Sequence, residues 1–225
     1  MTRRIVKEYN IRYNEILDCA QNFFFTLGYE QTSIQMIIDE VGIAKGTFYH
    51  YFHSKEELLD GVIKRMLNQN LAVLTPIVED EQLNSLEKFT QFVNYIGNWK
   101  LENITFFKDV MKVYYQEENA LFREKLKLAS IHFAVPLLSQ IIRQGIAEGE
   151  FETDDPESTA EIIIEIGQPL SRNFASLIVS TDKSNGDMTI IRNKINAYQS
   201  AIERILHAQP GSLEFIDFAQ LDQWL

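Results

Sequence analysis

Residues 32–52 read TSIQMIIDEVGIAKGTFYHYF, the most informative stretch of this chain of 225 residues. Its first half carries isoleucine or valine at positions 34, 37, 38 and 41, a spacing that predicts a short helix with one buried stripe. Thr32 followed by Gln35 has the spacing of a capping box at the start of that helix. Gly42 ends it, because glycine accepts the positive φ of a tight turn. We therefore expect a turn here, followed by a second helix.

The second helix has an apolar side and a polar side at 100° per residue. The apolar side is formed by Ala44, Phe48, Tyr51 and Phe52, whereas the other side carries Gly46, Tyr49 and His50 with Lys45 and Thr47 at its margins. A glycine on an exposed helical face costs about 1 kcal/mol relative to alanine, so its presence suggests that something approaches the backbone closely. DNA in a major groove would do so in a helix-turn-helix protein. The solvated face of an ordinary helical hairpin is the alternative.

The flanking segments extend this pattern. Ser54 and Glu57 form a second capping box before a long amphipathic helix, and residues 11–27 form another amphipathic run that Gly28 closes. The whole stretch GYEQTSIQMIIDEVGIAKGTFYHYFHSKEELL closely resembles the DNA-binding segment of the TetR family of bacterial transcription regulators. The resemblance covers about the first 67 residues.

This resemblance implies a set of DNA contacts. Thr32, Ser33 and Lys55 correspond to phosphate contacts, and the recognition-helix positions are Lys45, Gly46, Thr47, Tyr49 and His50, with Tyr49 on phosphate. The chemistry agrees in kind, since helix N-termini, hydroxyl groups and ammonium groups all bind phosphate oxygens. The chain departs from the family at Ala44, where serine is frequent, and this leaves the base contact at that position open.

Charge is distributed unevenly along the chain. Residues 1–65 carry 8 Lys and Arg against 9 Asp and Glu, whereas residues 66–225 carry 13 against 23, and the chain's net charge is −11. Acidic groups repel the phosphate backbone, so this distribution favours site-specific over promiscuous DNA binding. An acidic surface that serves solubility alone is equally compatible.

The N-terminus and the single cysteine bear on location. Arg3, Arg4 and Lys7 precede polar residues, so we expect no signal peptide, and we expect no membrane-spanning apolar run. These basic residues could reach DNA, but a disordered terminus is the commoner explanation. Cys19 excludes a disulfide within one chain and is expected to be a buried thiol, compatible with a reducing cytoplasm. We expect a cytoplasmic protein without a membrane partner.

The rest of the chain keeps a helical pattern. Turn signals at Thr75-Pro76, Asp154-Asp155-Pro156 and Ser184-Asn185-Gly186-Asp187 separate helices expected at 84–100, 103–116, 119–148, 156–180 and 187–208. The fold class is therefore all-α. We expect a helix-turn-helix domain at residues 1–53 and a larger helical domain for effector binding and dimerisation at residues 54–225. Residues 212–225 are expected to form a short extra helix docked on the body.

Aromatic residues are concentrated between positions 89 and 133, and Pro136 and Pro169 should kink their helices. Most aromatic residues pack in a core, yet bundles also hold ligands between aromatic-lined helices. The resemblance implies a small effector in this domain, and we expect it to be apolar or aromatic. The expected pocket residues are Phe92, Trp99, Phe107, Tyr114, Phe133 and Arg172.

The last two long helices carry apolar stripes, which predict a homodimer through a four-helix bundle. The stripes are Ile162, Ile163, Ile166, Leu170, Phe174, Leu177 and Ile178, followed by Ile191, Ile195, Tyr198, Ile202, Ile205 and Leu206. A palindromic operator also requires two-fold symmetry. The alternative is that these stripes face the chain's own core.

Catalysis finds no support, because His50, His53, His132 and His207 lack metal-ligand spacing and no nucleophile motif or phosphate-binding loop occurs. We expect no cofactor and no metal. The sequence predicts a DNA-binding transcription regulator, expected to be a repressor that a small effector releases from double-stranded operator DNA. A helical interaction protein or nucleoid-associated protein without an effector is the main alternative, and an enzyme is a third.

Overall fold

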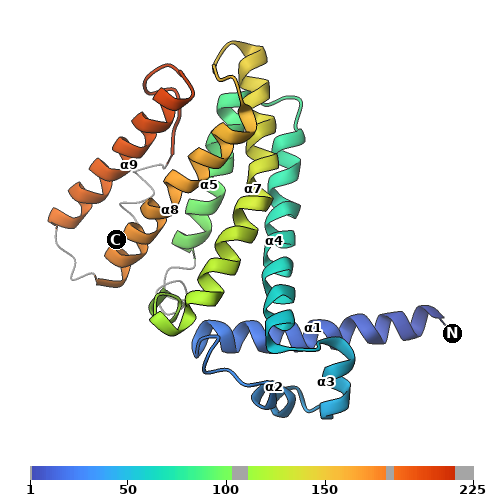
Figure 1. Cartoon of the computed structure of the whole chain (residues 1–225). Helices are drawn as coiled ribbons and strands as arrows, with labels where there is room; N and C mark the ends of the chain where they lie inside the picture. The colour runs from blue at the N-terminus through green and yellow to red at the C-terminus, as the bar shows by residue number, and fades with distance from the viewer. Residues whose placement is uncertain (1, 103–110, 181–184, 216–225) are drawn as a thin grey trace. The chain divides into compact units, whose positions relative to one another are not determined.

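Helices form every regular element in the described part of the chain (Figure 1), which confirms the all-α class. The computed structural model describes the backbone of residues 2–102, 111–180 and 185–215, and the side chains of residues 9–95, 111–169, 189–190 and 192–215. The chain divides into two compact units, Met1–Asn68 with Asp109–Ala129, and Gln69–Lys108 with Ser130–Leu225. Residues from the middle of the chain complete the first unit, and the expected domain boundary after residue 53 stays a prediction.

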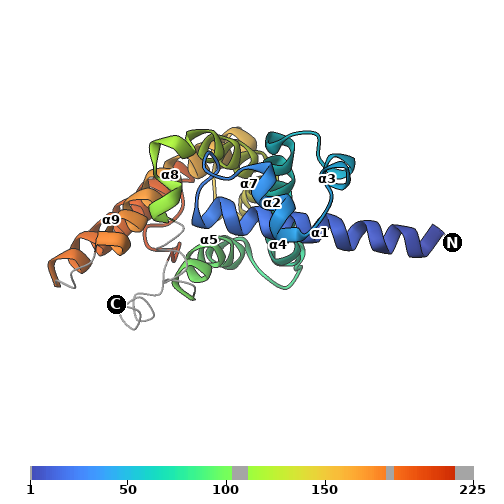
Figure 2. The ribbon, with the colours of Figure 1, turned by 90° about the horizontal axis from the view of Figure 1, so that it is seen from below.

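The first unit contains three helices, the first half of a fourth and a returning segment. The elements are α1 (Thr2–Thr26), α2 (Ile34–Val41), α3 (Lys45–Tyr51), the start of α4 (Lys55–Glu79), the 3-10 turn η1 (Glu117–Asn119) and the start of α7 (Ala120–Glu148). The fully buried core residues include Phe24, Ile37, Phe48, Leu58 and Phe122. α1 begins at Thr2, so the basic arm is helical and not disordered, and its N-terminal end projects past α2 and α3 (Figures 1 and 2).

The second unit contains the rest of α4 and α7 together with α5 (Ser85–Glu102), α8 (Pro156–Ser180) and α9 (Asn185–Ile205). α8 packs beside α9. Phe89, Leu138, Ile141, Ile142 and Leu206 form the centre of its core. The helix boundaries at α5, α7 and α8 agree with the sequence expectation to within about two residues, as periodicity allows.

The turn expected at Thr75-Pro76 is wrong, because α4 continues through it to Glu79. Pro76 lies close to the end of the helix, where a missing backbone hydrogen bond interrupts little of the ladder. The buried Lys88 ammonium donates to the Val78 carbonyl at 2.7 Å and so satisfies one of the last carbonyls of α4. A tertiary contact thus stabilises a helix end that the local sequence had assigned to a turn.

The residues after α9 dock on the second unit without forming a helix up to Phe215. Leu213 and Phe215 are buried in its core, and the buried Glu203 carboxylate accepts from the Gly211 N–H at 2.9 Å and from the Leu213 N–H at 3.3 Å. The docking of this segment is therefore as expected, but residues 212–215 are not helical. Residues 216–225 lie outside the described residues.

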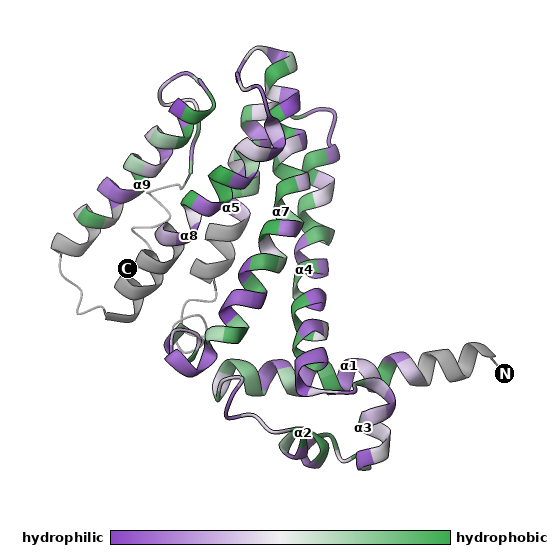
Figure 3. Cartoon of the chain, in the orientation of Figure 1, coloured by the Kyte–Doolittle hydropathy of each residue, from purple (hydrophilic) through white to green (hydrophobic). Residues whose placement is uncertain are grey.

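Apolar and polar residues alternate along α4 and α7 (Figure 3). Among the described residues, one segment, Glu117–Glu148, is long and apolar enough to span a membrane by length and composition. Its apolar residues Leu137, Leu138, Ile141 and Ile142 are buried in the second unit. Core helices of globular domains can share this length and composition, and the buried residues show that part of this segment packs in a core.

Candidate DNA-binding surface

The turn between α2 and α3 has the geometry that the sequence predicts. Gly42 adopts φ 70° and ψ 40°, and its N–H donates to Ile38 O at 3.0 Å. Ile43 N donates to the same carbonyl at 3.1 Å. This left-handed termination fixes the direction in which the chain enters α3.

The expected capping box at Thr32 and Gln35 is wrong by one residue. Ser33 is the N-cap of α2, and its Oγ accepts from Met36 N at 3.2 Å, while Gln35 binds Asp39 instead. Thr32 is buried, and its hydroxyl donates to Gly28 O at 2.7 Å. Thr32 therefore holds the loop before α2, and only Ser33 remains exposed for an approaching phosphate.

α3 is divided into a buried side and an exposed side. Phe48 and Phe52 are buried, whereas the side chains or backbone of Lys45, Gly46, Tyr49 and His50 are exposed and Thr47 is half-buried. A Cβ added to Gly46 would have no protein atom within 4 Å, so the protein's own packing does not require glycine there. The open space lies on the polar side of the helix, where a ligand could approach the backbone.

Lys55 does not present a free ammonium. Its Nζ donates to Tyr29 O at 3.0 Å and to Glu30 O at 3.4 Å, and it lies 4.3 Å from the centroid of the Tyr29 ring. These contacts satisfy carbonyls of the loop between α1 and α2. In this structure the Lys55 ammonium has internal partners, and its expected phosphate contact stays a prediction.

The start of α4 follows the sequence expectation closely. Ser54 Oγ accepts from Glu57 N at 2.9 Å, and Glu57 Oε2 accepts from His53 N at 2.7 Å. The two bonds resemble a capping box. The Glu57 side chain accepts from the N–H of His53, the residue before the N-cap Ser54, and not from the N–H of Ser54 itself. They satisfy two N–H groups at the helix start.

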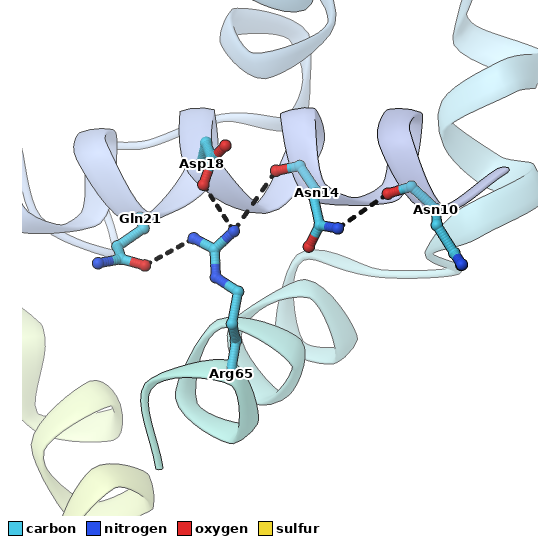
Figure 4. A network of polar contacts seen from close by, with 5 residues as sticks. All are labelled: Asn10, Asn14, Asp18, Gln21 and Arg65. Carbon is cyan, nitrogen blue, oxygen red and sulfur yellow. Dashed lines mark hydrogen bonds and ion pairs between the residues drawn. The ribbon is translucent and has the colours of Figure 1, made fainter. Parts of the chain in front are cut away.

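A polar network joins α4 to α1 within the first unit (Figure 4). The Arg65 guanidinium donates to Asp18 Oδ1 at 2.6 Å and to Gln21 Oε1 at 2.6 Å, and it approaches Asn14 O at 3.5 Å. Only 17% of the Arg65 side chain is exposed. The partners of Arg65 lie on successive turns of α1, and a planar guanidinium tolerates little rotation. These bonds therefore fix the position of α1 relative to the start of α4.

A segment from the middle of the chain completes the core beneath the helix-turn-helix, which sequence reasoning missed. Phe122 is 1% exposed and lies against Phe24 and Phe25, with ring centroids 6.5 and 5.9 Å away. The buried Asn119 accepts from Tyr29 N at 2.7 Å and donates to Val113 O at 2.8 Å. The only sequence signal for this docking is the aromatic enrichment that includes Phe122.

Lys125 adds an ionic contact between the same segment and α4. Its Nζ lies 2.7 Å from Asp60 Oδ1 and 2.9 Å from Glu56 Oε1, and these hydrogen bonds raise the pKa of Lys125. Both carboxylates are more than half exposed, so the contact adds little stability by itself. It specifies which turn of α7 meets the start of α4.

The expected pocket residues belong to both compact units. Phe92 is buried in the core of the second unit and Phe133 packs against that core, but Tyr114 packs in the first unit at 5.7 Å from the Phe122 ring. The side chains of Trp99, Phe107 and Arg172 lie outside the described residues. Tyr114 thus packs against the core beneath the helix-turn-helix, and the expected pocket stays a prediction.

The apolar stripes of α8 and α9 are partly directed inward. Ile163, Ile195, Ile202 and Leu206 are buried in the core of the second unit, as the alternative interpretation of these stripes has it. Ile162 of the α8 stripe, in contrast, is 50% exposed, and so is Ile190, which precedes the α9 stripe, at 48%. Among the described residues, no group of three or more His, Cys, Asp or Glu side chains is placed to hold a metal ion.

Comparison with known proteins gives the same assignment for both parts of the chain. Residues 16–62 match the family model described as bacterial regulatory proteins, tetR family, and residues 103–174 match the tetracyclin repressor-like C-terminal domain. The chain is 26% identical over 165 residues to the uncharacterized HTH-type transcriptional regulator YfiR of Bacillus subtilis, covering 71% of this chain and 78% of that protein. It is 26% identical over 155 residues to the HTH-type transcriptional repressor KstR2 of Mycobacterium tuberculosis, covering 67% and 74%.

A solved structure shares the fold. The crystal structure of a putative TetR-family transcriptional regulator from Syntrophomonas wolfei aligns with a TM-score of 0.61 and 20% identity, covering 86% of this chain and 96% of that one. The helix-turn-helix geometry, the two family matches and the curated relatives agree. The chain belongs to the TetR family of DNA-binding transcription regulators.

Proposed function

We propose that this regulator is a homodimeric repressor that binds a palindromic operator through α3 and is released by a small effector. The observation that carries the proposal is the two-sided α3. Phe48 is fully buried, while the opposite face is open at Gly46, where an added Cβ would meet no atom within 4 Å. A helix with this division can enter a major groove without disturbing the core that holds it. The protein then acts by binding and not by catalysis, in the cytoplasm where the operator lies.

The proposed DNA contacts follow from exposure and chemistry. Tyr49 and the N-cap Ser33 are exposed and are assigned to phosphate, because hydroxyl groups and helix N-termini bind phosphate oxygens. Lys45, Thr47 and His50 are assigned to base edges, with Gly46 allowing the backbone to approach. Thr32 and Lys55 are left out of this set because their polar groups are engaged inside the protein.

The proposed effector acts through the segment that completes the first unit. Phe122 and Asn119 pack directly beneath the helix-turn-helix, yet both belong to the region that matches the family's C-terminal domain. An effector that favours a conformation with this segment displaced would also change the support of the helix-turn-helix. The response is then a shift between two populations, whose size is limited by the effector's differential affinity for them.

We retain an apolar or aromatic effector as part of the proposal. Phe133 is half-buried against the core that contains Phe92, and the Tyr95 hydroxyl donates to Asn70 Oδ1 at 3.1 Å at the edge of the same core. Apolar surface with few polar groups suits a ligand that is mainly hydrocarbon or aromatic.

The proposed dimer uses exposed apolar residues of α8 and α9, Ile162 from the predicted α8 stripe and Ile190 next to the predicted α9 stripe. Ile162 and Ile190 are large apolar side chains left half-exposed on two neighbouring helices, whereas Ile202 serves the core. A two-fold contact through α8 and α9 would cover them. Sedimentation of the variant carrying Ile162→Glu and Ile190→Glu should show a monomer, and a dimer of unchanged stability would exclude this face.

Selection of duplexes from a randomised library by the full-length protein tests the function as a whole. The expected result is a palindromic motif whose half-sites are one helical turn, about 34–36 Å, apart. Affinity for the selected duplex should exceed that for a scrambled duplex by at least about 1000-fold at physiological salt. Equal affinity for all duplexes would favour the nucleoid-associated alternative. A selected motif whose binding no small molecule changes would support a DNA-binding regulator but exclude release by an effector.

A further inference from the structure

The amphipathic face of α1 continues past the core and ends in contact with α3. Tyr13 stacks on the buried Phe52, with ring centroids 5.0 Å apart. Tyr9, one turn earlier on α1, lies against Tyr51 at 4.6 Å and against His50 at 6.0 Å. Residues four apart share a helix face, so Tyr9 and Tyr13 lie on the same side of α1. Tyr13 contacts the core at Phe52, and Tyr9 contacts the exposed end of α3.

Two tyrosines hold the imidazole ring of His50. The Tyr9 ring meets it at an interplanar angle of 85° and the Tyr51 ring at 76°, with the second centroid 5.3 Å away. Edge-to-face contacts at such distances are favourable beyond the apolar area that they bury. His50 is exposed, yet its ring has a defined orientation relative to α3.

α3 needs support of this kind because it is short. It spans seven residues, and its N-cap residue Ala44 provides no side-chain hydrogen bond. A helix of this length is unstable by itself, so its position depends on tertiary contacts. Phe48 and Phe52 fix the buried side, and, among the described side chains of α1, Tyr9 contacts His50 in the last turn of the exposed side.

We propose that Tyr9 is a positioning residue for sequence recognition, which fixes the His50 ring in the orientation that meets a base edge. The inference rests on the proposed role of α3 as the recognition helix. Tyr9 itself is 40% exposed and contacts both Tyr51 and His50, so its contacts lie at the end of α3 and not in the core. A side chain ordered before binding loses less conformational entropy when the complex forms.

The test uses the full-length protein and the duplex that the wild type selects from a randomised library. Tyr9→Ala should weaken binding roughly three- to tenfold, the range expected for one aromatic pair. Tyr9→Phe should bind as the wild type does, because the ring provides the contact. Ile11→Ala is the matched control, since Ile11 is 51% exposed on the same helix and should have no effect.

Coupling to His50 distinguishes positioning from a general structural role. Tyr9→Ala added to His50→Ala should cause no further loss of affinity, because the ring that Tyr9 orients is already absent. Repeated selection should show that Tyr9→Ala and His50→Ala relax the preference at the same base pairs. Thermal melts identify any unfolded variant, and if Tyr9→Ala unfolds, Tyr9→Leu takes its place and should show the same loss.

Three outcomes would overturn the inference. Wild-type affinity and preference in Tyr9→Ala, with a loss in His50→Ala, would show that His50 needs no support from Tyr9. An equal loss in Tyr9→Phe would assign the effect to the tyrosine hydroxyl. Full additivity of the two alanine variants would mean that they act separately. If His50→Ala and Gly46→Leu both bind as the wild type does, α3 is not the recognition helix and the proposed function itself fails.

Discussion

The Asn119 amide accepts a hydrogen bond from the backbone N–H of Tyr29 at 2.7 Å, although 90 residues separate them in sequence. The same amide donates to Val113 O at 2.8 Å, so it joins the segment before α7 to the loop after α1. Gly28 permits this approach, because a Cβ at that position would lie 2.6 Å from Asn119 Nδ2. The first unit is thereby closed by a contact that no local pattern specifies.

Asn119→Ala should lower the free energy of unfolding by about 1–3 kcal/mol, because it leaves the buried Tyr29 N–H without its acceptor. Urea denaturation monitored by circular dichroism measures this change. Asn68→Ala is the control, since Asn68 is exposed. Equal stability of the two variants would mean that water replaces the Asn119 amide without cost.

Two helical glycines should respond in opposite ways to alanine. Gly46→Ala should leave stability unchanged or raise it by up to about 1 kcal/mol, because no atom opposes the new Cβ and the helix gains propensity. Gly145→Ala should destabilise by at least about 1–3 kcal/mol, because its Cβ would overlap the Phe151 ring. Thermal unfolding of both variants checks the contrast. DNA binding by Gly46→Leu should nevertheless be lost, since its side chain would occupy the space proposed for the DNA.

Lys45 and Lys55 should differ in the salt dependence of DNA binding. Replacing Lys45, which is exposed on α3 and assigned to a base edge, with alanine should reduce the magnitude of the slope of log affinity against log salt by up to about 1, because its ammonium enters the phosphate-lined groove. Lys55→Ala should leave the slope unchanged and lower the stability, because its ammonium is bound to Tyr29 O. Titrations at several salt concentrations measure both slopes, and a reduced slope in Lys55→Ala would restore its expected phosphate contact.

Cys19 should react slowly with alkylating reagents. Burial, aided by the nearby Glu40 carboxylate, raises the pKa of the thiol from 9.0 to about 11, so at pH 8 the folded protein holds roughly 100-fold less thiolate than the unfolded chain. Since the folded state retains the proton more tightly, this group's contribution to stability is present below pH 9 and is lost as the pH rises towards 11. Iodoacetamide labelling with and without denaturant measures the difference. Equal labelling rates would place the thiol in water.

Local patterns were sufficient for the helix-turn-helix. The turn at Gly42, the capping box of Ser54 and Glu57, and the two sides of α3 depend on residues within about four positions of one another. The structure has all three, although Ala44, expected on the apolar side of α3, is exposed. The cap of α2 was placed one residue early because Thr32 and Ser33 both carry hydroxyl groups. A contact with the Gly28 carbonyl, which helix periodicity does not describe, decides between them.

The sequence by itself therefore determined the all-α class, most helix boundaries and the polar face of α3. Only the tertiary structure decided that Lys55 faces inward, that Tyr114 and Phe92 lie in different cores, and that Ile202 is buried while Ile162 is exposed. Periodicity specifies which face of a helix is apolar but not which partner covers it. That choice depends on contacts between segments that are distant in sequence, such as Asn119 with Tyr29. Closing the loop between such segments costs conformational entropy, and this cost is offset only when the whole core assembles.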